Sequence, residues 1–310
     1  MRLLVAALVG SLTAIGALGQ SAVPGGFALD ARPDTTRVVL LGTGNPNPDP
    51  DRSGPAVAVI AGGRPYLVDC GPGVVRRAEA ARRRGIEALD VKNLDIVFIT
   101  HLHSDHTLGC PDLLLSPWVM HRESPLRVYG PPGTQALFDG ILRGYAADIE
   151  NRRTGFQPHN ESGWRVEVTE IAPGVVHSDG NVRVIAFAVP HAGWANAFGY
   201  RFEAPDRTIV ISGDTSPSDA VVEACRGCDV LVHEVYSTSA YARLPVEWQR
   251  YHGDAHTSAA ELAEIAGRAR PRLLVLYHQL FWGVTEEDLL AELRETYDGE
   301  TVSADDLDVF

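Results

Sequence analysis

Short apolar runs and amphipathic segments alternate along this chain from about residue 37 onward. Runs rich in Val, Ile, Leu and Phe that are bounded by Gly, Pro or Asp are typical of buried strands. They predict strands at 38–41, 56–60, 66–68, 94–99, 164–171, 182–189, 198–202, 208–211, 230–233 and 273–277. Apolar residues at helical spacing predict helices at 74–84, 134–145, 218–225, 258–269 and 285–297. This alternation indicates an α/β fold.

A cluster of metal-ligating residue types follows the strand expected at 94–99. His101, His103, Asp105 and His106 stand within six positions of a chain that has 11 histidines. The spacing of two lets the rings of His101 and His103 project to the same side, while Asp105 and His106 can face a second point. A purely structural role would leave buried polar groups without partners, which is costly. The cluster therefore indicates a metal site.

Further polar residues stand at the carboxyl ends of predicted strands. They are His191 after 182–189, Asp214 after 208–211, Glu234 after 230–233 and His278 after 273–277. Layered α/β folds place their sites at this edge, so we expect these residues to converge with the histidine cluster. Taken singly, His191 and His278 could equally be structural histidines, and Asp214 could be a turn or helix-cap aspartate.

Composition and charge narrow the function classes. The chain has 310 residues, 45% of them hydrophobic, which is enough for one large domain or two small ones. Its net charge of -13 argues against broad binding of polyanions. Two bound cations could still attract a phosphate locally. Nucleic acid is therefore not the expected partner.

The N-terminal residues differ from the rest of the chain. Arg2 precedes an uncharged apolar stretch at 3–19 that ends in small residues, the pattern of a secretory signal peptide. We expect a signal at 1–22 with cleavage near Gly19/Gln20, a linker at 23–36, and a periplasmic or secreted protein without stable membrane association. An uncleaved membrane anchor is the alternative.

Four cysteines are too few for a disulfide scaffold in a chain of this length. Cys225 and Cys228 have the spacing of a redox or zinc-binding CxxC, but no second CxxC accompanies them. We favour an incidental pair or a local disulfide. Cys70 and Cys110 lie close in sequence to the expected ligand loops, but neither takes a ligand position.

The joint pattern resembles the metallo-β-lactamase fold hydrolases, and within them the ribonuclease Z and arylsulfatase-like branch. The resemblance runs in order from about Arg37 to the C-terminus, through the segments THLHSDH, VPHAGWANAFGYRF, SGDT, VHEVY, HTSAAELAEIA and LYHQ. It implies a four-layer αββα sandwich over residues 37–310 with a dinuclear site on one edge.

The resemblance also implies a ligand set and its chemistry. One metal is held by His101, His103 and His191, the other by Asp105, His106 and His278, with Asp214 bridging the two. Nitrogen and oxygen donors favour two Zn²⁺ ions, with Mn²⁺ or Fe as alternatives. The two ions hold a bridging hydroxide as the nucleophile.

Three residues are expected to act in catalysis. Asp105 orients the hydroxide, and His256 paired with Glu234 is the candidate general acid for the leaving oxygen. The alternative for His256 is a surface histidine at a helix entry. Asp69 either supports a ligand or is a turn aspartate. His252, Trp194 and Trp282 either line the mouth of the site or pack in the ordinary way.

The resemblance breaks at one place. In the short form, ribonuclease Z clamps tRNA with an arm between the positions matching His191 and Asp214, whereas here residues 192–213 separate them, 22 in all. The segment 146–163, which contains Arg152, Arg153, His159 and Asn160, reads as an irregular insertion that caps the site and selects the substrate.

The sequence therefore predicts a hydrolase of phosphodiester or sulfate-ester bonds in small-molecule substrates. A 3′ tRNA endonuclease of the ribonuclease Z type, a lactone or thioester hydrolase of the same fold, and a non-catalytic binding protein stay open as alternatives. The sequence leaves the oligomeric state open between a monomer and a homodimer. True β-lactamase activity is disfavoured, because antibiotic-cleaving relatives have a cysteine ligand near the bridging position.

Overall fold

The computed structural model describes residues 35–310. The expected signal peptide at 1–22 and most of the linker at 23–36 lie outside these residues. Within that range, none of the helices combines the length and the apolar character needed to cross a bilayer.

The first half of the chain forms a six-stranded sheet. Its strands lie in chain order, with antiparallel pairing among the first three and parallel pairing from the third to the sixth. They are β1 (Arg37–Gly42), β2 (Ala56–Ala61), β3 (Arg64–Val68), β4 (Ile96–Phe98), β5 (Leu126–Gly130) and β6 (Val166–Glu170).

The second half forms a seven-stranded sheet in the order β13-β12-β11-β10-β9-β8-β7. Its strands are β7 (Gly174–Ser178), β8 (Arg183–Ala188), β9 (Phe198–Glu203), β10 (Thr208–Ile211), β11 (Val230–Tyr236), β12 (Leu273–Leu280) and β13 (Thr301–Ser303). Strands β7 to β10 pair antiparallel, and β10 to β13 pair parallel. Three neighbouring strands, β10, β11 and β12, therefore end at the same edge of this sheet.

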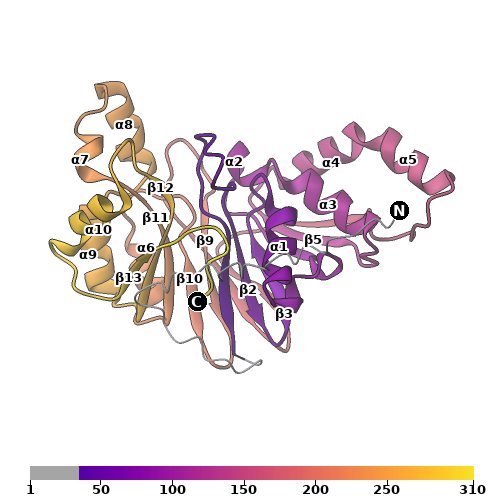
Figure 1. The fold of residues 1–310 in the computed structure, drawn as a ribbon, viewed down its shortest axis with the longest axis horizontal. Helices are drawn as coiled ribbons and strands as arrows, with labels where there is room; N and C mark the ends of the chain where they lie inside the picture. The colour runs from indigo at the N-terminus through magenta and orange to yellow at the C-terminus, as the bar shows by residue number, and fades with distance from the viewer. Residues whose placement is uncertain (1–34) are drawn as a thin grey trace, which may run out of the picture. The chain divides into compact units, whose positions relative to one another are not determined.

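The two sheets pack face to face, and helices cover both outer faces (Figure 1). Strand β2 shows why: Val57 and Val59 belong to the core between the sheets, whereas Ala58 and Ile60 belong to the core under the helices of the first sheet. Alternating residues of one strand are thus buried on both faces. This arrangement confirms the expected four-layer αββα sandwich.

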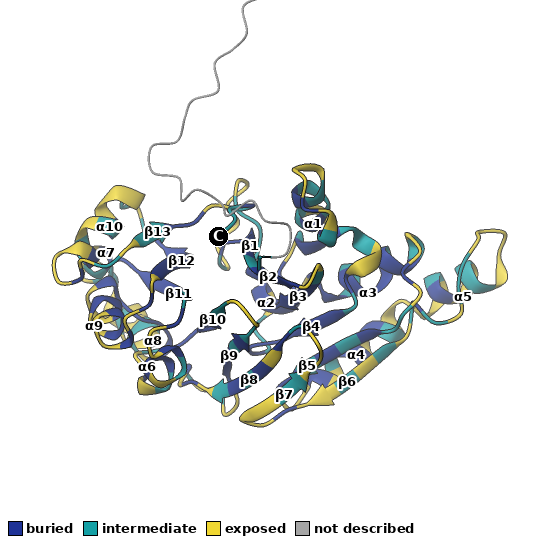
Figure 2. Ribbon diagram, turned by 90° about the horizontal axis from the view of Figure 1, so that it is seen from below, coloured by how far each residue is buried: buried dark blue, intermediate teal, exposed yellow. Residues whose placement is uncertain are grey.

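Helices α1 (Val74–Arg83), α3 (Cys110–Val119) and α4 (Thr134–Gly144) cover the first sheet. Helices α6 (Asp219–Cys225), α9 (Ala259–Ala269) and α10 (Glu286–Arg294) cover the second (Figure 2). The capping box expected at Ser258 and Glu261 is present at the start of α9. The remaining helical segments are α2 (Ser104–Thr107), α5 (Ala146–Thr154), α7 (Thr238–Tyr241), α8 (Val246–Ala255) and the two 3-10 turns η1 (Glu87–Leu89) and η2 (Val91–Asn93).

The interpretation of 146–163 as an irregular insertion over the site is wrong. Residues Ala146–Thr154 form helix α5, which lies beyond β6 at the far end of the first sheet, away from α2 (Figures 1 and 2). Its charged residues contact one another or nearby residues: Arg152 donates to Asp148 at 2.9 Å, and Arg153 lies 3.5 Å from Glu161. The segment therefore extends the helical layer and does not cap the site.

All four cysteines are paired. Cys225 and Cys228 form a local disulfide in the turn between α6 and β11, as favoured from the sequence. The second disulfide joins Cys70, just after β3, to Cys110, the first residue of α3, with 5.2 Å between their Cα atoms. This pair was not predicted, and it ties together the two loops that flank the histidine cluster.

Candidate metal centre

Strand ends bring the seven expected ligands to one edge of the sandwich. The chain leaves β4 and presents His101 and His103, and the single turn α2 then presents Asp105 and His106. Residues from the second sheet meet them from the opposite side: His191 follows β8, Asp214 follows β10, and His278 lies within β12.

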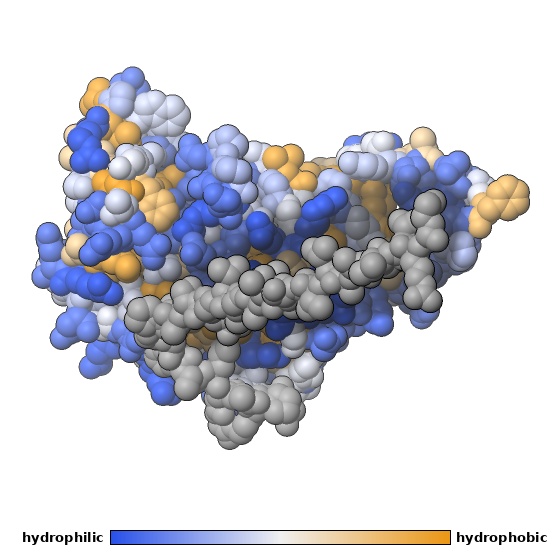
Figure 3. Space-filling model, viewed as in Figure 1, coloured by the Kyte–Doolittle hydropathy of each residue, from blue (hydrophilic) through white to orange (hydrophobic). Residues whose placement is uncertain are grey.

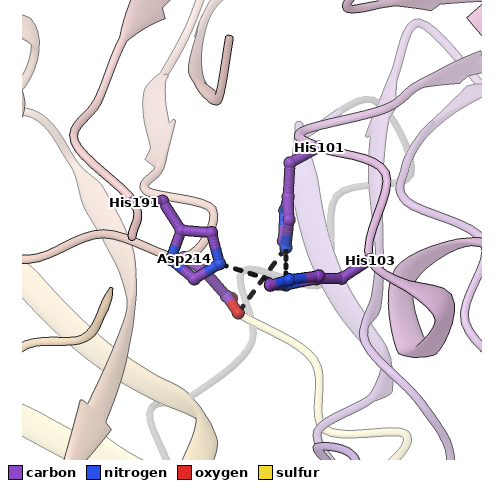
Figure 4. Close-up of side chains that lie close together, drawn as sticks. All are labelled: His101, His103, His191 and Asp214. Carbon is purple, nitrogen blue, oxygen red and sulfur yellow. Dashed lines mark hydrogen bonds and ion pairs between the residues drawn. The ribbon is translucent and has the colours of Figure 1, made fainter. Parts of the chain in front are cut away.

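Three imidazoles and one carboxylate form the first group of ligands (Figure 4). His101 Nε2 lies 2.9 Å from His103 Nδ1, and His191 Nε2 lies 3.1 Å from the same His103 atom. Asp214 Oδ2 lies 3.9 Å from His101 Nε2. All four ligand atoms fall within 4.8 Å of one another, so a single cation can contact them together.

The second group lies on the other side of the same carboxylate. Asp105 Oδ2 is 3.5 Å from His106 Nε2 and 3.3 Å from His278 Nε2. Asp214 Oδ2 is 3.3 Å from His106 Nε2 and 3.4 Å from His278 Nε2. One oxygen of Asp214 is therefore within reach of both groups, as expected for a bridging ligand.

Hydrogen bonds behind the ligands fix their tautomers. Asp69, which is buried, accepts hydrogen bonds from His106 Nδ1 at 2.8 Å and from the Thr100 amide and hydroxyl at 2.8 and 2.9 Å. The Thr100 hydroxyl in turn accepts from His101 Nδ1 at 3.0 Å. His191 Nδ1 donates to the Ala255 carbonyl at 2.7 Å. With Nδ1 protonated, Nε2 of each ring is free to bind a cation, so Asp69 supports ligands.

Unusual backbone conformations direct the side chains of two of these residues, His278 and Asp214, toward the site. His278 has φ of 48°, and the β11–β12 register shifts beside it, between Glu234 and Val235. A left-handed residue in a strand costs about 1 to 2 kcal/mol, and it turns the side chain out of the regular alternation. Gly213 has φ of 63°, and a Cβ there would lie 2.7 Å from the Phe198 carbonyl oxygen, so the turn that presents Asp214 requires glycine.

The protonation states suit cation binding. Burial lowers the pKa of His101 well below its usual value and that of His103 to about 4, so both rings are neutral and keep a lone pair at neutral pH. Burial alone would raise the pKa of Asp214, but the neighbouring His278 and His106 hold it well below its usual range. Burial alone would lower the pKa of His106 and His278, but Asp214 and Asp69 raise that of His106 well above its usual value, and Asp214 raises that of His278. An ionised carboxylate thus stands between two neutral rings, His101 and His103, and two rings that release a proton when a cation binds.

Unsatisfied polar atoms point to the same conclusion. In the part of the chain that the structure describes, His106 Nε2 and Asp214 Oδ1 are buried and form no hydrogen bond. Burying a polar atom without a partner costs free energy. Two bound divalent cations would supply partners for the lone pairs of these atoms. The ligand set therefore fits a dinuclear site for divalent metals.

Glu234 and His256 lie together beside the bridging carboxylate. Glu234 Oε1 accepts from the Thr257 and Thr215 amides at 3.0 and 3.3 Å, and Oε2 lies 3.4 Å from His256 Nδ1. His256 is only 5% exposed, so it is not a surface histidine at a helix entry. Its Nδ1 lies 4.0 Å from Asp214 Oδ2, farther than the nearest imidazole nitrogens of His106 and His278.

Burial shifts the two pKa values in opposite directions. The pKa of Glu234 is raised well above its usual value by burial and by the charge of Asp214. The pKa of His256 is lowered to about 4, mainly by burial. The pair therefore keeps a proton more readily on Glu234 than on His256.

Aromatic residues surround the opening. Trp194 Nε1 lies 2.8 Å from His103 Nε2, so this side chain contacts a ligand. His252 and Trp282 line a cavity of about 780 Å³ that reaches His256. Sequence reasoning missed Trp248 and Tyr251, which line the same cavity. Trp248 stands three residues before Tyr251 and four before His252, about one helical turn from each, and this spacing was the available signal.

Comparison with known proteins places these features in a family. The sequence profile of the beta-lactamase superfamily domain matches residues 64–279. A ribonuclease Z of Mycobacterium marinum is 37% identical over 244 residues, which are 78% of this chain and 85% of that protein.

Two solved structures show the same fold. The short form of human tRNase Z superimposes with a TM-score of 0.66 at 25% identity, covering 88% of this chain and 98% of that one. The metallo-beta-lactamase fold protein YhfI from Bacillus subtilis gives a TM-score of 0.66 at 19% identity, covering 89% and 100%.

Metal content tests the shared role of Asp214. We expect metal-replete protein to contain two equivalents per chain, His278→Ala to retain about one, and Asp214→Ala to lose most of both, because only Asp214 contacts both groups. Elemental analysis after dialysis measures this. The exposed Asp298→Ala is the control and should keep two. Equal losses in Asp214→Ala and His278→Ala would contradict a bridging role.

Proposed function

Because this chain belongs to the beta-lactamase superfamily and is a metal-dependent hydrolase, we propose that it cleaves phosphodiester bonds in RNA, in the manner of ribonuclease Z. The observation that supports this most is the pairing of Glu234 with His256 beside the seven ligands, in a chain that is 37% identical to a ribonuclease Z.

The similar proteins make RNA a better candidate substrate than small phosphodiesters or sulfate esters. The sequence alone favoured small phosphodiesters or sulfate esters and argued against nucleic acid, whereas the relatives favour the ribonuclease Z alternative. The negative net charge does not oppose this, because two bound cations can attract a phosphate locally. None of these relatives is named for a sulfate-ester substrate, so a sulfate ester has no similar support as the substrate of this enzyme.

The size of the RNA substrate follows from the fold. The segment between His191 and Asp214, where the resemblance to ribonuclease Z leads us to expect a tRNA-clamping arm, contains here the antiparallel pair β9–β10. Both strands are part of the second sheet, and Phe198, Tyr200 and Phe202 of β9 are buried in the core between the sheets. We therefore propose that the enzyme recognises the few nucleotides next to the scissile bond.

The side chains around the site have separate roles. The two ligand groups joined by Asp214 would hold two divalent cations, most suitably Zn²⁺ for these donors, which would supply an activated water and stabilise charge on the phosphoryl oxygens. Burial would raise the pKa of Asp105, but the hydrogen bond from His278 and the charge of His106 lower it. Asp105 is thus ionised and accepts a hydrogen bond that orients the attacking water.

Glu234 and His256 deliver a proton to the leaving oxygen. The 3.4 Å contact between Glu234 Oε2 and His256 Nδ1 lets the carboxyl group pass its proton to the ring. The ring donates the proton of its other nitrogen to the leaving oxygen, so the leaving group departs as a neutral alcohol, His256 stays neutral and Glu234 becomes the carboxylate.

A substrate panel tests the proposed reaction. Metal-loaded protein should cleave short RNA and bis(p-nitrophenyl) phosphate with a kcat/KM at least about 10² above that for sulfate esters, thioesters and lactones, because the shared carboxylate and the proton-donating pair suit a phosphodiester. Asp214→Ala protein, purified in the same way, controls for contaminating nuclease. A preference for a sulfate ester or a lactone would overturn the proposal.

The leaving group tests the role of His256. We expect His256→Ala to slow phosphodiesters with an alkyl leaving group by about 10² to 10⁴, and to affect p-nitrophenyl esters little, because that phenolate leaves without a proton. Glu234→Gln should show the same asymmetry more weakly. Equal slowing of both substrates at full metal content would assign His256 to substrate binding or to structure.

We also propose that the protein is exported. The apolar stretch at 3–19 is typical of a signal peptide, and the two disulfides agree with an oxidising compartment. An exported enzyme of this kind would degrade RNA outside the cytoplasm.

Intact-mass measurement tests the proposed export. The chain recovered from the extracytoplasmic fraction should begin near Gln20 to Val23, and its mass should lack four hydrogens relative to the reduced form, because both cysteine pairs are joined. A cytoplasmic protein that keeps Met1 and four free thiols would contradict export and would favour a role in tRNA processing.

A further inference from the structure

A cavity of about 780 Å³ lies next to the metal centre and is not used by the ligands. It opens between helix α8 and the segment that follows β12. Its walls include Trp248, Tyr251, His252, His256, Leu280 and Trp282. Within residues 35–310, this lining contains no Lys, Arg, Asp or Glu side chain.

The aromatic rings form a continuous path from the surface to the metal centre. Trp248 stacks on His252 with 5.6 Å between ring centroids, and His252 lies 5.6 Å from His256. His256 in turn stacks on the ligand His278 at 5.6 Å. Trp282 contacts this path from the segment after β12, with its ring centroid 4.6 Å from that of His252. A group seated between these rings would touch the candidate general acid.

Packing does not account for these aromatic residues. Trp248 is 53% exposed and Tyr251 is 40% exposed, although both are large and largely apolar. Only Ala255 of helix α8 is buried. In the space-filling view, apolar side chains lie among polar ones over the end of the molecule formed by α7 and α8, as they do elsewhere on the visible face (Figure 3). Exposed aromatics around a cavity are typical of a binding site.

We propose that this cavity binds the planar ring of the leaving alcohol, which for an RNA substrate is the base of the nucleoside that leaves. The proposal rests on the proposed phosphodiesterase function. His256 lines the cavity, and its Nδ1 lies 3.4 Å from Glu234 Oε2, so the other ring nitrogen is left to donate to an oxygen of the group seated in the cavity.

The chemistry of the lining selects an uncharged flat ring. Burial lowers the pKa of His252 to about 4, so this ring is neutral at pH 7 and adds no positive charge. A phosphate would find no cationic side chain among the described lining residues, whereas every nucleobase has a face that can stack on Trp248 or Trp282. The cavity is large enough for a nucleoside.

Binding of adenosine, measured by calorimetry on zinc-loaded protein, tests the cavity directly. We expect adenosine to bind and ribose not to bind. Trp248→Ala should weaken adenosine binding at least about 10-fold, and Trp248→Phe should restore most of it, because stacking needs a flat ring. Tyr145→Ala is the matched control, because Tyr145 is 44% exposed and lies between α4 and α5 on the first sheet.

Kinetics separates this proposal from the proposed function. Trp248→Ala should raise KM about 10-fold for dinucleotides and leave unchanged the KM for dinucleotides whose leaving nucleoside lacks its base. If phosphodiesters are cleaved but Trp248→Ala matches Tyr145→Ala in binding and in KM, the cavity proposal is overturned and the phosphodiesterase stands. If adenosine binds through Trp248 but no phosphodiester is cleaved, the proposed function fails and the ring site stands.

Discussion

One buried carboxylate oxygen, Asp214 Oδ2, holds the two halves of this site together. It lies between 3.3 and 3.9 Å from ligand nitrogens of both groups, from His101 on one side and from His106 and His278 on the other. A buried negative charge is tolerated only where positive charge compensates it. The positions of β4, β10 and β12 are therefore linked: each strand must end where its histidine or aspartate can reach this oxygen.

Hydrogen bonds, a disulfide and a strained backbone position hold the ends of these strands in place. Asp69 and Thr100 orient the rings of His106 and His101, and the Cys70–Cys110 disulfide joins the loops on either side of the histidine cluster. His278 keeps a left-handed backbone inside a strand, which an unconstrained sequence would avoid. Because the site is assembled from two sheets, it depends on these hydrogen bonds and on the left-handed backbone of His278 to orient its side chains.

The convergence of the seven candidate ligands and the layer architecture could be predicted from the sequence because both depend on local pattern. Six of these residues come after short apolar strands, His278 lies within β12 just after its apolar run, and strand β10 has the bounds expected from the sequence. Helix α8 was missed because only Ala255 in it is buried, so it has no apolar periodicity. Strand β7 is exposed and has no alternating pattern, and the Cys70–Cys110 pair joins residues 40 positions apart. These features depend on tertiary contacts that local pattern does not encode.

A crystal structure of zinc-loaded protein, with anomalous scattering measured at the zinc edge, would show whether Asp214 bridges two metal ions. We expect two zinc peaks about 3.5 to 4 Å apart, with the Asp214 carboxylate contacting both. His101, His103 and His191 should surround one peak, and Asp105, His106 and His278 the other. A single peak, or two peaks of which only one contacts Asp214, would contradict this arrangement.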